Sequence, residues 1–531
     1  MARLNFTRRE VLTAAGVAVV AAPLSPTRSR AAAKYTRYNV SSANGQKMLA
    51  TYAKGVEAML KLPADHSRNW FRNAFIHLLD CPHGNWWFYV WHRGYLGHFE
   101  RIIRELTGDL RFTIPYWDWT ASPQLPDGMF DGVLTPTDAA FAQYTKDLNV
   151  FTSFIKPTMN KYFDGFSSAQ RAQMDKRKYK DFNALWNDVT GNGDPTNEAF
   201  AATDRSRYPT RANPKLDDKT KGNVLPLIIQ SGIQLAIAFN HPQSYLSFTS
   251  SKTASHHDGG ANQSILEYMP HNKVHNFIGG VGHIDAPWGS MTNFLSPVDP
   301  IFFLHHSNMD RLWDAWTRKQ IKDGLPYLPT GDDLKTFSEE PFLFFVDGLG
   351  QYLTNGKAGD YLSTDAFGYD YEPGSGDTIQ AVQGVAAANA APPIEGTVKG
   401  NVASVTIPRA SLERSLAATA PRPLAATVTI ARPAGSSRER EFDILVNAPA
   451  GTTQVSAESP YYAGTIAFFG PAMHGMNMAM DVTFPFPLPN RVQASVAREA
   501  AADAVLNVQV VPSSGNRENA PAIRAVSVAA A

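Results

Sequence analysis

The sequence lacks several features that mark common functional classes. Its 531 residues include one cysteine, Cys81, so an intrachain disulfide is excluded and the chain must be held by its core. The formal net charge is +1 and charged residues make up 18%, so charge gives no basis for binding nucleic acid or a membrane surface. No apolar run reaches the roughly 20 residues that a membrane-spanning helix needs. We therefore expect no nucleic-acid partner and no stable membrane insertion.

Residues 1–33 resemble an export signal. Arg8 and Arg9 stand directly before a modest apolar run from residue 11 to about residue 23, and alanines occupy positions 31–33. Paired arginines before such a run are typical of a twin-arginine signal peptide. We expect these residues to direct export through the twin-arginine pathway, so that the protein is periplasmic or secreted.

Composition divides the rest of the chain into four segments. Residues 34–372 are rich in Trp, Phe and His and place apolar residues at intervals of three and four, as amphipathic helices do. Residues 373–397 are Gly-, Ala- and Pro-rich, which is typical of a linker. Residues 398–513 alternate apolar with polar residues and favour Val, Ile and Thr. Residues 514–531 are expected to be a flexible tail. The predicted fold class is α+β and multidomain, with a mainly α-helical core and a small C-terminal β-sandwich-like domain.

Most of the histidines fall in two clusters. The first cluster lies in NAFIHLLDCPHGNWWFYVWHRGYLGHFE and contains His77, His83, His92 and His98. The second contains His271, His275, His283, His305 and His306.

Two histidines of the second cluster have the spacing of metal ligands on a helix. His271 and His275 are four residues apart, so on a helix both imidazoles project from one face, one turn apart. The segment DPIFFLHHSNMDRLW offers another imidazole from a second helix. Sites rich in imidazole and poor in carboxylate suit copper better than magnesium, calcium or non-haem iron. Zinc would also accept three histidines, but two such sites together indicate a pair of redox metals.

Three motifs resemble those of one known family. HGNWWFYVWHRGYLGHFE resembles the first copper signature of the tyrosinases, catechol oxidases and haemocyanins, and HNKVHNFIGG with DPIFFLHHSNMDR resembles the second. YDYE at 369–372 is similar to the Tyr-x-Tyr element that closes the family's core domain. On these motifs the chain is identified as a member of the type-3 (dinuclear) copper family, in the branch of the bacterial tyrosinases and polyphenol oxidases.

The resemblance implies two copper ions in a central four-helix bundle, each with three histidine ligands. His83 and His92 would bind the first copper. The third ligand lies upstream: the resemblance favours His77, because FIHLLDC resembles the family's His-x-x-x-Cys arrangement, and His66 is the rival. In several family members a cysteine at the position of Cys81 is joined to the following ligand histidine, which implies a Cys81–His83 thioether; a buried apolar filler is the simpler interpretation.

For the second copper, the resemblance implies the ligands His271, His275 and His306. In the family pattern the ligand is followed by three residues and then Asp, which selects His306 over its neighbour His305. Asp310 would then orient the helix or an imidazole. Five further histidines match no family role and are expected on the surface or in packing: His98, His241, His256, His257 and His283.

Two polar residues resemble the family's water-holding pair. Glu267 stands four residues before His271, and Asn272 follows that histidine directly. In the family such a pair serves the proton transfer that monophenol hydroxylation needs. The simpler interpretations are an exposed carboxylate at a helix start and a capping amide. A side chain that gates access is expected near Asn293 or Phe294.

The implied activity is that of a tyrosinase or polyphenol oxidase. Such an enzyme uses O2 to ortho-hydroxylate monophenols and to oxidise o-diphenols to o-quinones, so the expected partners are small phenols and O2. The C-terminal domain would keep the enzyme latent until it is displaced. The alternatives are a haemocyanin-like O2 carrier and an o-aminophenol oxidase, and the sequence leaves a homo-oligomer open.

Overall fold

The computed structural model describes most of the chain after the expected signal segment. The described residues are 33–216, 244–377, 393–410, 424–433, 438–453, 455–456, 459–470, 481–488, 492, 494 and 503–530. Residues 1–32, His241 and most of the expected linker lie outside this part. Residues 33–531 belong to one compact unit. A search of the described residues finds no helix with the length and apolarity needed to cross a bilayer.

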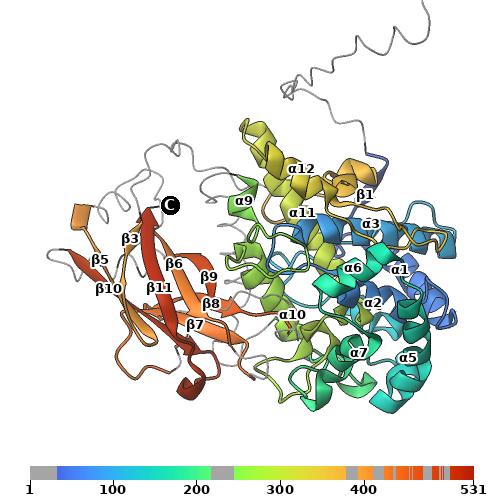
Figure 1. The fold of residues 1–531 in the computed structure, drawn as a ribbon, viewed down its shortest axis with the longest axis horizontal. Helices are drawn as coiled ribbons and strands as arrows, with labels where there is room; N and C mark the ends of the chain where they lie inside the picture. Colours follow the sequence, from blue (N-terminus) through green and yellow to red (C-terminus); the bar gives the residue numbers. More distant parts are fainter. Residues whose placement is uncertain are drawn as a thin grey trace, which may run out of the picture. The chain divides into compact units, whose positions relative to one another are not determined.

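Four helices carry most of the clustered histidines: α2 (Trp70–Asp80), α3 (Phe88–Thr107), α10 (Asn272–Gly279) and α11 (Ile301–Lys322). Helix α2 begins at Asn69, whose side chain accepts hydrogen bonds from the Phe71 and Arg72 amides. Every residue of α2 and of α10 is buried, as expected of helices at the centre of a large core. Around them lie α1 (Ala43–Lys61), α4 (Ala139–Thr145), α5 (Leu148–Asp164), α6 (Ser168–Lys176), α7 (Phe182–Thr190), α9 (Tyr245–Phe248) and α12 (Asp332–Glu339) (Figure 1).

Asp310 of α11 is hydrogen-bonded to residues near both ends of the sequence of the helical part and to α3. It accepts hydrogen bonds from Arg93 on α3 (2.7 Å) and Arg37 on β1 (Tyr35–Arg37) (3.0 Å). It also accepts from Tyr369 and Tyr371 of β2 (Tyr369–Tyr371), which pairs with β1 in parallel. The hydrogen bonds of Asp310 thus go to arginines and tyrosines of α3, β1 and β2 rather than to an imidazole.

Two antiparallel sheets form the C-terminal part, as the alternating pattern predicts (Figure 1). The order of one sheet is β4-β5-β10-β7-β8, and that of the other is β3-β11-β6-β9. The strands are β3 (Ile394–Glu395), β4 (Thr397–Lys399), β5 (Val402–Ile407), β6 (Leu424–Ala431), β7 (Glu441–Val446), β8 (Tyr462–Ala467), β9 (Asp481–Pro487), β10 (Ala504–Pro512) and β11 (Ile523–Ala530).

Two expected boundaries in this part are wrong. The segment 514–531 is not a flexible tail throughout, because β11 pairs along its length with β6 and buries Val526 and Val528 in the sandwich. The expected linker 373–397 is also too long, since β3 and the first residue of β4 lie within it. Alanine is uncommon in strands, so an Ala-rich segment gives little sign of a strand whose neighbours in the sheet come from distant parts of the chain.

Strands β7 and β8 contact both the sandwich and the helical part. All their residues are buried, whereas a strand with one face toward solvent would expose every second residue. Ile444 and Ile466 belong to the sandwich core. On the other side, Glu441 of β7 forms an ion pair with Lys273 of α10.

Candidate metal centre

The first histidine cluster combines two helices and the loop between them. His77 lies on α2, His92 lies on α3, and His83 lies in the connecting loop. His77 Nδ1 donates to the Phe294 carbonyl (2.8 Å), and His92 Nδ1 donates to the Phe88 carbonyl (2.7 Å). Because the Nδ1 atoms are held by the backbone, the Nε2 lone pairs of these two rings are available for a metal ion.

The rival upstream ligand lies outside this cluster. His66 is half-buried, and its Nδ1 accepts a hydrogen bond from the Arg68 amide (3.1 Å). The ligand atoms of His77, Cys81, His83 and His92, in contrast, all lie within 4.8 Å of one another. The structure therefore brings His77 into the cluster and leaves His66 outside.

The second cluster combines α11 with a distorted turn before α10. His271 ends a π-helical turn, Glu267–His271, that contains Pro270. Proline has no N–H to donate in a regular helix, and single π turns of this kind are frequent at functional sites. His275 Nδ1 donates to the Met291 carbonyl (2.6 Å), and its Nε2 faces Nε2 of His306 at 3.2 Å.

Both adjacent histidines of α11 enter the second cluster. Ligand atoms of His271, His275, His305 and His306 lie within 4.8 Å of one another. The His306 ring stacks on His92 of the first cluster, with centroids 4.1 Å apart and planes 7° apart. The His305 ring lies instead 4.9 Å from Trp119. His306 therefore lies between the two clusters, whereas His305 lies on the far side of the second.

Burial keeps these imidazoles neutral. It lowers the pKa of His92 and of His271 to about 3, and it lowers the pKa of His77, His83, His275 and His306 well below the usual value. Among the described residues of the second cluster, His271 Nε2, His306 Nδ1 and both ring nitrogens of His305 are buried and have no hydrogen-bond partner. Buried neutral nitrogens without partners are the donors that copper prefers, so the residues present fit a copper pair.

Cys81 lies within the first cluster. Its Sγ is 3.1 Å from Nδ1 and 3.8 Å from Nε2 of His83, the two nitrogens that flank ring carbon Cε1. It is also 3.0 Å from His77 Nε2. Burial raises the pKa of the thiol, which is the behaviour of a cysteine in an apolar site.

Glu267 is buried rather than exposed at a helix start. Its carboxylate accepts hydrogen bonds from the Gly84 amide (2.6 Å) and the Ser250 hydroxyl (2.5 Å). Burial raises the pKa of Glu267 to about 7, although both hydrogen bonds oppose that shift. A carboxyl group with this pKa can accept and release a proton near neutral pH.

Asn272 connects the second cluster to the C-terminal part. Its Oδ1 accepts from His271 Nδ1 (2.8 Å), and its Nδ2 donates to the carbonyl of Ala467 in β8 (2.8 Å). The amide therefore orients a cluster imidazole while it is itself bound to the covering strand.

Phe469, which follows β8, packs among the histidines and was missed from the sequence. Its ring lies 4.6 Å from the centroids of both His83 and His275, so it touches both clusters. It also lies 5.4 Å from Phe294, at the expected position of a gate. The available signal was the Phe468-Phe469 pair at the end of a strand, where consecutive side chains point to opposite sides.

Comparison with known proteins agrees with this geometry. A family model described as the common central domain of tyrosinase matches residues 49–319. A chloroplastic polyphenol oxidase of Vitis vinifera is 27% identical over 365 residues, which are 66% of this chain and 48% of that protein. A tyrosinase of Hahella sp. (strain CCB-MM4) is 28% identical over 298 residues, 55% of this chain and 47% of that protein. The chain thus spans about half the length of these curated relatives.

Solved structures extend the likeness to the C-terminal part. A recombinantly expressed latent aurone synthase (polyphenol oxidase) aligns with a TM-score of 0.56 and 18% identity, over 93% of this chain and 89% of that chain. A latent apple tyrosinase aligns with a TM-score of 0.53 and 19% identity, over 93% and 96%. At these identities the likeness establishes the fold, including the arrangement of a helical part followed by strands.

Proposed function

The chain belongs to the tyrosinase family, and on that basis we propose that it is a dicopper oxidase of small phenols. It would use O2 to ortho-hydroxylate monophenols and to oxidise o-diphenols to o-quinones. The observation that carries this proposal is the contact between two clusters of buried, neutral imidazoles, with His306 stacked on His92 at 4.1 Å. When bound, two copper ions so placed would supply electrons to one shared O2 molecule.

The family motifs imply the ligand assignment, and the direction of several ring nitrogens supports it. We assign His77, His83 and His92 to the first copper and His271, His275 and His306 to the second. The 3.2 Å approach of the Nε2 atoms of His275 and His306 supports His306, because lone pairs that face one point suit a single ion. His305 is assigned no ligand role, since it lies away from the first cluster.

Glu267 would act as the proton acceptor for monophenols. Its pKa of about 7 leaves a large fraction ionised at neutral pH, so its carboxylate can take the phenol proton, through a water molecule held with Asn272. Diphenols ionise and lose electrons more easily, so their oxidation would depend less on this base.

The position of Cys81 supports a thioether between its Sγ and His83. Such a bond would hold the His83 ring in one orientation. Peptide mapping under denaturing, non-reducing conditions tests it: the cross-link predicts a joined peptide, and full alkylation of Cys81 would rule it out.

The C-terminal part would keep the full chain latent. Phe469 fills space beside His83 and His275 where a phenol ring must dock, and Ala467 holds the Asn272 amide. A substrate can therefore reach the metal pair only after this part moves or is removed.

We further propose that residues 1–33 export the chain through the twin-arginine pathway, to the periplasm or beyond. Replacing both Arg8 and Arg9 with Lys should retain the protein in the cytoplasm, as cell fractionation would show; unchanged export would contradict the proposal.

Oxygen consumption tests the function. The full chain is loaded with copper and given L-tyrosine or L-DOPA, before and after limited proteolysis. We expect slow uptake before proteolysis and fast uptake with both substrates after it. Reversible O2 binding without substrate-dependent uptake would indicate an O2 carrier instead, and uptake with o-aminophenol alone would indicate an o-aminophenol oxidase.

A further inference from the structure

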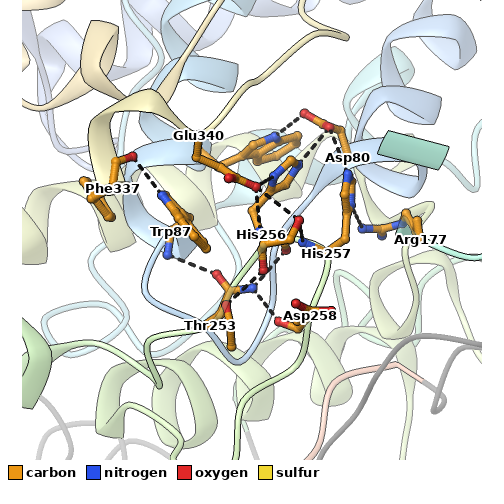
Figure 2. Close-up of polar contacts among 12 residues, drawn as sticks. Asp80, Trp87, Arg177, Thr253, His256, His257, Asp258, Phe337 and Glu340 are labelled. Carbon is orange, nitrogen blue, oxygen red and sulfur yellow. Dashed lines mark hydrogen bonds and ion pairs between the residues drawn. The ribbon is translucent and has the colours of Figure 1, made fainter. Parts of the chain in front are cut away.

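A second group of buried polar and charged residues includes Asp80, His256 and His257 (Figure 2). At its centre is His256, which is completely buried. Its Nε2 donates to the carboxylate of Asp80 (3.0 Å), and its Nδ1 donates to the carboxylate of Glu340 (2.6 Å). Glu340 also accepts from the His256 amide (2.9 Å). Sequence reasoning assigned this histidine only to the surface or to packing.

The hydrogen bonds determine the charge of His256. An imidazole that donates through both nitrogens is the protonated, positively charged form. The two carboxylates account for this, because their attraction raises the pKa of His256 in spite of its burial. Arg177, which donates to the Cys81 carbonyl (3.0 Å), supplies a second buried positive charge nearby. The negative charges of Asp80 and Glu340 are thus balanced by the positive charges of His256 and Arg177 in the interior.

His256 joins three separate elements. Asp80 is the last residue of α2 and directly precedes Cys81, and it also accepts from the Trp91 indole of α3 (2.8 Å). Glu340 directly follows α12. The residues from 250 to 260, here called the clamp loop, are therefore fixed at His256 to the end of the helix that carries His77.

The clamp loop in turn holds the segment that carries His83. Asn85 Nδ2 donates to the carbonyls of His256 and Asp258, both at 2.9 Å. The Gly260 amide donates to the Gly84 carbonyl (2.9 Å), and the Gly84 amide donates to Glu267. Residues 83–85 have no helix or strand of their own, so these bonds determine where His83 and the Glu267 carboxylate lie.

A third metal ion is a weaker explanation of this cluster. Asp80, His256 and His257 do place ligand atoms within 4.8 Å of one another. However, both ring nitrogens of His256 already lie at hydrogen-bond distance from carboxylates, so the protonated ring has no lone pair to offer a metal ion. Arg177 also lies 3.3 Å from His257 Nδ1, and its positive charge opposes a bound cation.

We propose that His256 is a positioning residue for the first copper site: as an imidazolium held by Asp80 and Glu340, it anchors the clamp loop, and the loop places His83 and Glu267. This inference rests on the proposed function for the identity of the metal. The hydrogen bonds themselves are independent of it.

The test compares His256→Gln with the matched control His257→Gln, its equally buried neighbour. Copper(II) sulfate is titrated into the copper-free full chain, and amide exchange at Gly84 and Gly260 is measured in the same copper-free sample. For His256→Gln we expect the affinity for the first ion to fall roughly 10- to 100-fold, with the second ion unaffected. We expect amide exchange at both glycines to accelerate roughly tenfold or more. The control should change neither.

A second pair of variants separates positioning from simple loss of packing. His256→Gln combined with Glu340→Gln removes one charge of each sign and should recover part of the affinity and of the slow exchange. Asn85→Asp removes the two hydrogen bonds from Asn85 to the carbonyls of His256 and Asp258 but leaves the His256 imidazole and its carboxylate partners in place, and it should also accelerate exchange at the neighbouring Gly84 amide. This variant decides the matter if His256→Gln does not fold.

Several results would overturn the inference. These are unchanged exchange at Gly84 in Asn85→Asp, normal copper binding by a folded His256→Gln, or a third tightly held metal ion that is lost with His256. If the parent chain binds no copper, the proposed function fails, while the exchange data still decide whether the loop is held by His256.

Discussion

The ring of Phe469 lies on the imidazole of His83, with centroids 4.6 Å apart and planes 28° apart. The preceding residue, Phe468, packs in the opposite direction against Phe442 and Phe484 of the β-sandwich. Consecutive side chains of an extended chain alternate in direction, so one strand end contributes to two cores. The C-terminal part is thereby joined to the candidate metal centre by one aromatic side chain.

Phe469→Ala should activate the full chain. Removing the ring frees the space beside His83 and His275, so oxygen uptake with L-DOPA should rise roughly tenfold or more without proteolysis, a change of about 1.4 kcal/mol in barrier. Phe468→Ala is the matched control: Phe468 is half-buried, so the variant should destabilise the sandwich by about 1–3 kcal/mol, measured by denaturant unfolding, without comparable activation. Equal activation by both variants would show that destabilisation of the β-sandwich, and not removal of the Phe469 ring, opens the site.

Glu441→Gln should weaken the attachment of the C-terminal part. Glu441 of β7 and Lys273 of α10 are both buried, and removing one charge of a buried pair costs about 3–5 kcal/mol. Full-chain activity and the rate of cleavage by protease should therefore rise together. Adding Lys273→Met should restore latency, because the buried charge is then gone. If Glu441→Gln leaves the full chain as latent as the parent, contacts other than this ion pair hold the C-terminal part in place.

Glu267→Gln should lower monophenol turnover far more than diphenol turnover, by roughly 100-fold if Glu267 is the general base. The pKa of Glu267 is about 7, so the carboxyl group is protonated below that pH and cannot accept a proton. In the parent, monophenol turnover should therefore rise with pH through about 7, and the variant should lack this rise. Parallel losses for L-tyrosine and L-DOPA would disprove the role.

His306→Asn should abolish binding of the second copper, whereas His305→Asn should retain two ions per chain. The reason is that His306 faces His275 at 3.2 Å, while His305 lies against Trp119. Metal analysis after reconstitution and dialysis measures the difference. Loss of an ion in His305→Asn with retention in His306→Asn would reverse the assignment.

The copper-free chain should lose stability as the pH falls below about 6.5, the ordinary pKa of histidine. The pKa of His92 and of His271 is about 3 in the folded state, so these rings stay neutral there while unfolded chains take up protons. The stabilisation is complete above the unfolded pKa and is lost as pH falls toward 3. The free energy of unfolding should therefore fall by more than about 1.4 kcal/mol per pH unit, and less steeply in His92→Gln. A flat profile between pH 7 and pH 5 would contradict this.

Local spacing and the family motifs together were enough to find most of the candidate centre. His271 and His275 share a helix face because of their four-residue separation, and His83 and His92 stand within a recognisable motif. The alternation of Val, Ile and Thr likewise predicted the sandwich. Such signals persist in the sequence because they depend on residues close together along the chain.

The sequence alone therefore determined the helical core, the two histidine clusters and their suitability for copper, since periodicity and donor chemistry are local properties. The tertiary structure agreed with the choice of His77 over His66, and it alone decided that Phe469 covers the site, that β11 completes a sheet, and that His256 carries charge between Asp80 and Glu340. Each of these depends on which distant segments meet when the core excludes water, and no pattern within a short window of sequence records that meeting.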